Sequence, residues 1–158
     1  MLIAESPPSN PERFFYYPNV KEHDHLFLAV MQTLYPELYH SYMSSSRASH
    51  VKVNLLKRFQ LDGFYLLDLF KSSSDISKVH KNQAVRRMIK SLRAVAAQDT
   101  PIILIKSTVY DVLADPLVEA GFINVARERV PFPLYQWKSV FLERFSRALF
   151  KAGFKTEE

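Results

Sequence analysis

The sequence contains no cysteine. This absence excludes disulfide bonds, thiolate metal sites, iron–sulfur clusters and cysteine nucleophiles, and it suits a reducing, cytoplasmic location. Only three glycines are present, too few for a glycine-rich phosphate-binding loop, and no serine stands in a glycine-flanked nucleophile motif. The chain therefore lacks the usual signatures of several large enzyme classes.

Long apolar runs are also missing. No stretch approaches the roughly 18 to 20 apolar residues that a membrane span needs. Glu5 and Pro7 interrupt the apolar start after three positions, unlike a signal peptide. With 47% hydrophobic, 13% aromatic and 23% charged residues, the composition is that of a globular protein. We expect one domain over residues 1–158 and no membrane partner.

Basic residues exceed acidic ones, which gives a formal net charge of +5. This excess permits a polyanionic partner such as DNA. In the segment 78–93 six basic side chains stand with no acidic residue between them, which suits either a solvated helix face or contacts with phosphates. They are Lys78, Lys81, Arg86, Arg87, Lys90 and Arg93.

Four short apolar runs predict four strands, at residues 2–4, 64–69, 102–105 and 122–125. The second and third are continuous rather than alternating, as in parallel strands buried on both faces. Helical patterns lie between them. The sequence therefore predicts a three-layer α/β/α domain with a central, mostly parallel, four-stranded sheet.

Apolar residues at helical spacing place the helices. One begins after Asp24, a predicted N-cap, and Pro36 ends or restarts it. The pattern predicts further helices over about 51–61, 77–97, 108–120 and 135–151. Thr108 and Asp111 have the spacing of a capping box, which predicts the start of the fourth.

Ligands of parallel α/β sheets bind beyond the carboxyl ends of the strands. The loop after the first predicted strand carries Glu5 and the aromatic run 14–17, and Asp68 ends the second strand. The loop 127–137 holds Pro131 and Pro133, which rigidify it. These strand ends suit a flat ligand that is stacked on an aromatic ring and contacted by a carboxylate.

At these positions the chain resembles the uracil-DNA glycosylase superfamily, in particular its uncharacterised bacterial branch. "LIAESPP" (2–8) resembles the first motif, a Gly-Glu-Ala-Pro-Gly type loop, and "DGFYLLDLF" (62–70) resembles the second core strand. "PIILIKSTVYDVL" (101–113) resembles the intervening strand and helix, and "VPFP" (130–133) stands where the family has His-Pro-Ser-Pro. The resemblance covers nearly the whole chain. It implies a fold that receives a base flipped out of DNA.

The resemblance also implies roles for individual residues. Glu5 matches an acidic position that positions or activates water, and Ser6 falls where other branches carry a catalytic Asp or Asn. Phe15, or its neighbour Phe14, matches the aromatic residue that stacks on the base. Asp68 falls on the Asn that reads the edge of uracil. No cofactor is implied.

Two departures from the family pattern change the expected chemistry. An ionised Asp68 can only accept hydrogen bonds, so it would suit an exocyclic amine, as on cytosine or adenine, or require protonation. Val130 replaces the His that stabilises the departing uracil anion, and a valine side chain donates no hydrogen bond. Arg127 and Arg129 are the nearby cations that would take over this role.

Each of these residues also has a purely structural interpretation. Glu5 would cap the segment that follows, Asp68 would pair with a backbone amide or a lysine, and the aromatic run 14–17 would be packing. The His23–His25 segment alternates ligand types but offers no third ligand in sequence, so we expect no metal.

Three functional interpretations remain open. The first is a DNA glycosylase that hydrolyses an N-glycosidic bond, and the second is a catalytically inactive nucleic-acid-binding or interaction module on the same fold. The third, an unrelated small hydrolase or nucleotide binder, has no motif in its favour. Related glycosylases carry a helical segment before the first strand, so either such a segment is lacking or an apolar sheet face is exposed. An exposed face would promote self-association.

Overall fold

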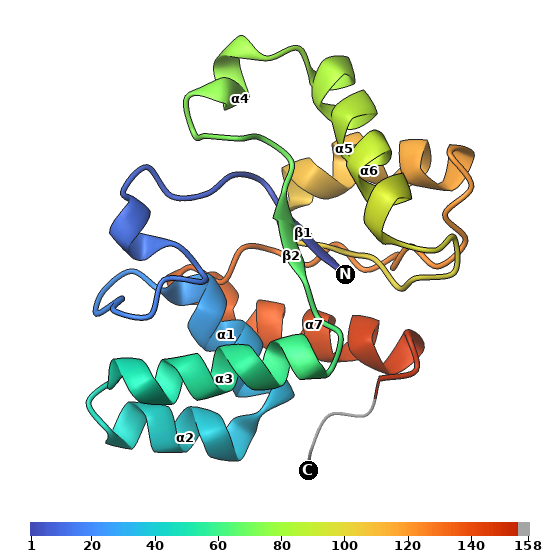
Figure 1. Cartoon of the computed structure of the whole chain (residues 1–158). Helices are drawn as coiled ribbons and strands as arrows, with labels where there is room; N and C mark the ends of the chain where they lie inside the picture. Colours follow the sequence, from blue (N-terminus) through green and yellow to red (C-terminus); the bar gives the residue numbers. More distant parts are fainter. Residues whose placement is uncertain (155–158) are drawn as a thin grey trace.

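The computed structural model describes residues 1–154, which form a small parallel sheet between two layers of helices (Figure 1). The strands are β1 (Leu2–Ala4), β2 (Leu66–Asp68) and β3 (Ile103–Leu104). The α-helices are α1 (His25–Leu34), α2 (Pro36–Ser44), α3 (Ser49–Leu61), α4 (Asp75–Lys78), α5 (Lys81–Val95), α6 (Ser107–Glu119) and α7 (Lys138–Lys151). Two 3₁₀ turns are η1 (Pro11–Arg13) and η2 (Tyr135–Trp137).

The sheet has the order β2-β1-β3, and both strand pairs are parallel. Ala4 lies opposite Asp68 of β2, and Ile3 lies opposite Leu104 of β3. The first strand along the chain is thus the central one. Because all three strands run in the same direction, their carboxyl ends meet at one edge of the sheet.

Three strands rather than four form the sheet within residues 1–154, which corrects the prediction for 122–125. That part of the chain joins the sheet only through two isolated parallel bridges, Ile102 with Val125 and Ile105 with Val130. Between the bridges the chain turns locally, since the amide of Val130 donates to the carbonyl of Glu128. An apolar run therefore reaches the sheet without forming a regular strand.

The two faces of the sheet bury different cores, as the alternation of strand side chains requires. Leu2 and Ala4 belong to one cluster, packed with α1, α2, α3 and α7. Ile3 faces the other cluster, packed with α5 and α6. The α/β class and the layered arrangement of helices around a parallel sheet are thus confirmed. Leu2 and Ile3 are fully buried, so the central strand exposes no apolar face.

The helices follow the predicted patterns closely. The third predicted helix, 77–97, is interrupted at residues 79–80, so that the short α4 precedes α5. Ala84, Met88 and Leu92 form the buried stripe of α5 at four-residue spacing. The predicted helix 135–151 begins with the turn η2. Among residues 1–154 no helix combines the length and the apolarity needed to cross a membrane.

Candidate functional site

A cavity of about 570 Å³ opens at the carboxyl ends of β1 and β2. This volume lies within the range typical of small-molecule sites, about 300–1,000 Å³. Its walls come from the loop after β1, the start of α1, the α4 segment and two later loops. In Figure 1 the blue loop after β1 and the green α4 segment lie beyond the same edge of the sheet. The lining residues with chemical potential are Glu5, Ser6, Arg13, Phe14, Phe15, Tyr16, His23, Asp24, Asp68 and Lys106.

All five residues predicted as catalytic or base-binding line this one cavity. Glu5 and Ser6 enter from the end of β1, Asp68 from the end of β2, and Phe14 and Phe15 from the following loop. The sheet register brings the end of β1 beside the end of β2. Ala4 pairs with Asp68, and the amide of Phe70 donates to the carbonyl of Glu5 at 2.8 Å.

Glu5 is held by two donors from the start of α6. Lys106 Nζ donates to one carboxylate oxygen, and Thr108 Oγ1 donates to the other at 2.8 Å. Thr108 therefore does not form the predicted capping box with Asp111, which instead pairs with Arg129. Glu5 does not cap the following turn either, since Asn10 caps η1. A carboxylate with both oxygens occupied by donors has a fixed orientation.

Lys106 has a backbone φ of +86°, a region that favours glycine. Its amide donates to the carbonyl of Val130 at 2.8 Å, and its own carbonyl accepts from the amides of Val109 and Tyr110. These bonds hold the strained backbone between the sheet and α6. Strain of this kind gathers at functional sites, because the surrounding structure must hold it.

Asp68, unlike Glu5, has no donor beside its carboxyl group among the described residues. Its carboxyl accepts no hydrogen bond and forms no ion pair among the described residues, although it lines the cavity. Burial raises its pKa to about 6, and no charged neighbour contributes to that shift. The structural interpretation, a pairing with a backbone amide or a lysine, is therefore not what the structure shows. The carboxyl is therefore open to a ligand that enters the cavity.

The two phenylalanines differ in how they meet the cavity. Phe15 is only 8% exposed and packs edge-on against Phe27, with ring centroids 5.4 Å apart, so it is also part of the core. Phe14 is 38% exposed, which leaves its ring free to contact a ligand. Tyr16 fixes the loop: its hydroxyl accepts from the amide of Leu66 at 2.8 Å and donates to the carbonyl of Leu66.

Sequence reasoning missed the functional potential of four cavity residues, Arg13, His23, Asp24 and Lys106. His23 has a backbone φ of +54°, unusual for a residue with a side chain. Asp24 occupies the predicted N-cap position of α1, but its side chain makes no capping hydrogen bond. These positions depend on long-range packing, for which the local sequence carries no signal.

The Asp24 side chain turns inward to two basic residues. Its Oδ2 accepts from Lys52 Nζ at 2.7 Å and from Arg47 Nη2 at 3.4 Å. Arg47 also donates to the carbonyls of Val20 and Lys21. This network connects the loop that carries His23 and Asp24 to the start of α3. It therefore stabilises one wall of the cavity.

The residues predicted to stabilise the leaving group do not reach the cavity. Val130 is fully buried in the core. Arg127 and Arg129 form ion pairs with Asp115 and Asp111 of α6, at 3.3 and 2.7 Å. Pro131 and Pro133 flank the residue that does line the cavity, Phe132, and Leu134 lines it as well.

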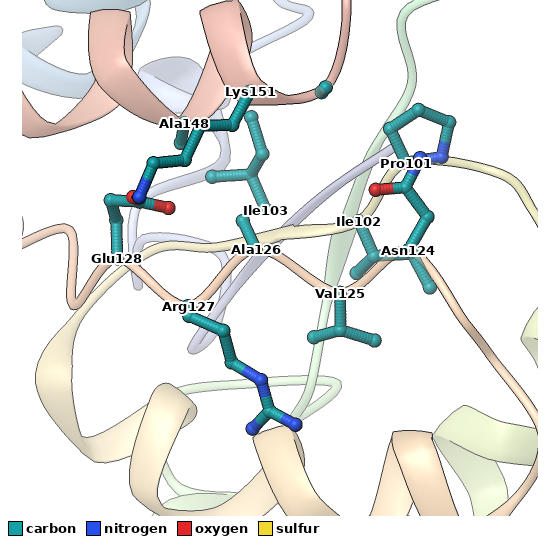
Figure 2. A pocket seen from close by; sticks show the side chains of 11 residues that line it. Pro101, Ile102, Ile103, Asn124, Val125, Ala126, Arg127, Glu128, Ala148 and Lys151 are labelled. Carbon is teal, nitrogen blue, oxygen red and sulfur yellow. The ribbon is translucent and has the colours of Figure 1, made fainter.

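A second hollow, about 170 Å³, lies between β3, residues 124–128 and α7 (Figure 2). There Lys151 Nζ meets Glu128 Oε1 at 2.6 Å, while Arg127 points to the other side of the segment. Arg127 is the predicted site residue that lines this hollow. Its small volume and its ion pair make it the weaker candidate for a ligand site.

The side chains predicted to contact DNA phosphates differ in exposure and in their partners. Lys78, Lys81 and Arg86 are exposed on α4 and α5. Arg87 instead donates to the carbonyl of Leu69 at 2.8 Å, so it ties α5 to the end of β2. Ile76 of α4 lines the cavity, and Lys78 ends the same short helix.

Within the described part of the chain, no group of three or more His, Asp and Glu side chains is arranged to hold a metal ion. No family model, curated protein or solved structure matches the chain. The site has to be interpreted from its own geometry.

Proposed function

We propose that this protein is a uracil-DNA-glycosylase-like enzyme that hydrolyses the N-glycosidic bond of a damaged or deaminated base in DNA. The observation that supports it is the convergence of Glu5, Phe14, Phe15 and Asp68 on one cavity beyond the strand ends. An aromatic wall suits a flipped base, and an oriented carboxylate with a second, unpartnered carboxyl suits acid–base chemistry on it.

Each residue then has a defined task. The Glu5 carboxylate, held by Lys106 and Thr108, orients the attacking water. The exposed ring of Phe14 stacks on the base, with Phe15 behind it. Asp68 meets the polar edge of the base from the end of β2. Exposed cations on α4 and α5, Lys78 among them, hold the DNA backbone.

The test is base release from duplexes that carry one uracil or one hypoxanthine, with abasic sites detected as alkali-labile breaks. We expect cleavage by the wild type and a loss of about 10²-fold or more in Glu5→Gln. Glu143→Gln is the matched control, because Glu143 is exposed on α7, pairs with Arg147 and does not line the cavity. If no base is released, or if Glu5→Gln releases the base as fast as the wild type, the enzymatic proposal is wrong.

One observation favours a second candidate, a catalytically inactive module that binds nucleic acid through the same cavity. Val130 is fully buried, and no side chain from its loop supplies the charge that the family uses on the leaving group. This candidate predicts retention of DNA on a gel at low salt without base release. Base release would then be absent from the wild type and from Glu5→Gln alike.

A further inference from the structure

The two carboxyls of the cavity stand at the carboxyl ends of neighbouring parallel strands but have opposite surroundings. Glu5 follows Ala4, the residue paired with Asp68. Glu5 accepts from an ammonium group and a hydroxyl, while Asp68 has neither an ion pair nor a hydrogen bond among residues 1–154. When two carboxyls of one site differ in this way, the ion-paired one suits a base and the unpartnered one suits an acid.

The charged and titratable groups that share the cavity with Asp68 do not offset its burial. Burial alone raises the pKa of Asp68 to about 6. A general acid works best when its pKa lies near the working pH. The other charged and titratable groups that line the cavity are Glu5, Arg13, Tyr16, His23, Asp24 and Lys106.

The other donors of the cavity are engaged or exposed. The Tyr16 hydroxyl donates to a backbone carbonyl, and the pKa of Tyr16 is raised to about 12, mainly by burial. Lys106 donates to Glu5. The His23 side chain is half-exposed beside Glu22. Arg13 is exposed and holds its protons too tightly to act as a proton donor.

We infer that Asp68 is the catalytic acid of this site and delivers a proton to the departing base, while Glu5 acts on the attacking water. This inference rests on the proposed glycosidic hydrolysis and changes the expected role of Asp68 from a hydrogen-bond acceptor to a proton donor. It also explains how the site dispenses with a donor at Val130, which is buried in the core.

The step balances without a cofactor. The bond between C1′ and the base nitrogen breaks, and its electron pair leaves with the base. The Asp68 hydroxyl proton passes to an oxygen or nitrogen of that base. Water attacks C1′, and Glu5 accepts the proton that the water loses. Proton exchange with solvent restores both carboxyls, so the products are the free base and an abasic sugar.

The experiment compares wild type and Asp68→Asn on duplexes with uracil or 5-fluorouracil, from pH 5 to 9. Fluorine makes the departing base less basic, so it needs less help from an acid. We expect kcat/KM of the wild type for uracil to fall above about pH 6. In Asp68→Asn that fall disappears, the uracil rate drops about 10²-fold or more, and the 5-fluorouracil rate drops less than tenfold.

The outcomes separate the two proposals. If the wild type releases neither base, the glycosylase proposal fails and the acid role falls with it. If the wild type releases both, but Asp68→Asn slows both equally or keeps the alkaline fall, only the acid role is wrong. Carboxyl-carbon NMR gives an independent check: an Asp68 signal that titrates near pH 4 in the folded protein would also overturn the inference.

Discussion

Lys52 Nζ lies 2.7 Å from Oδ2 of Asp24, and the Lys52 side chain is fully buried. The same ammonium group lies 4.0 Å from the centroid of the Phe27 ring. Asp24 lines the candidate cavity, so this interior ion pair supports one of its walls. A buried pair of this kind adds little net stability, but removing one partner leaves an uncompensated charge.

Lys52→Met should therefore lower the free energy of unfolding by about 3 kcal/mol, at the low end of the range for broken buried pairs because Arg47 remains near Asp24. Lys57→Met, an exposed lysine on the same helix, should change it by less than about 0.5 kcal/mol. Urea denaturation at pH 7 measures both. Equal midpoints for the two variants would contradict a structural role for the pair.

Asp68 makes the fold pH-dependent in a definite direction. Its pKa is raised from 3.8 to about 6 by burial, so the folded state binds the proton more tightly than the unfolded state. The destabilisation is absent at about pH 3, grows between pH 4 and 6, and is complete above about pH 7. Asp68→Asn removes it.

We expect Asp68→Asn to raise the free energy of unfolding by about 1–3 kcal/mol at pH 7.5 and to change it little at pH 3.5. Asp99→Asn, at an exposed position, is the control and should have no such pH-dependent gain. Urea unfolding at four pH values decides the matter. A gain that is the same at every pH would point to a cause other than the Asp68 charge.

The strained backbone at Lys106 gives a prediction in which glycine is more favourable than alanine. Both Lys106→Gly and Lys106→Ala remove the ion pair with Glu5, but only glycine relieves the φ of +86°. Lys106→Gly should be more stable than Lys106→Ala by about 1 kcal/mol, against the usual order of these residues. Thermal unfolding measures the difference, and base release should fall equally in the two variants.

If DNA follows the exposed cations of α4 and α5, removing two of them should change the salt dependence of binding. Lys78→Gln with Lys81→Gln should lower the slope of log affinity against log salt by about 2, because each phosphate contact contributes about 0.9. The charge-matched control is Lys57→Gln with Arg147→Gln, two exposed cations on α3 and α7. Fluorescence anisotropy at 50–200 mM salt measures this, and equal slopes for the two double variants would exclude this DNA path.

Local sequence patterns predicted most of the strands and helices. The run 2–4 is β1 to the residue, and the spacing of Ala84, Met88 and Leu92 defined the buried face of α5. Such patterns work because burial of a strand or a helix face repeats with a fixed period. The run at 122–125 is apolar too, but whether an apolar segment pairs along its length depends on the neighbouring backbone, which turns before Val130.

The site was predictable where it follows from strand ends. Glu5 and Asp68 had to lie at the same edge of the sheet once β1 and β2 were parallel neighbours. The partners of Asp24 were not predictable, because an N-cap position gives no sign of a lysine 28 residues away. Arg87 illustrates the same limit: six cations share one segment, and only packing decides that this one binds the carbonyl of Leu69.

The central position of β1 has a consequence for how the chain reaches its fold. Leu2 pairs with Leu66 and with Ile103. The two partner strands of β1 therefore lie more than sixty and more than one hundred residues later in the chain. During synthesis, β1 would lack its first partner until β2 has been made and its second until β3 has been made. Assembly of the sheet is therefore a late, non-local event, which slows folding and prolongs exposure of the apolar segment 2–4 to chaperones or to other nascent chains.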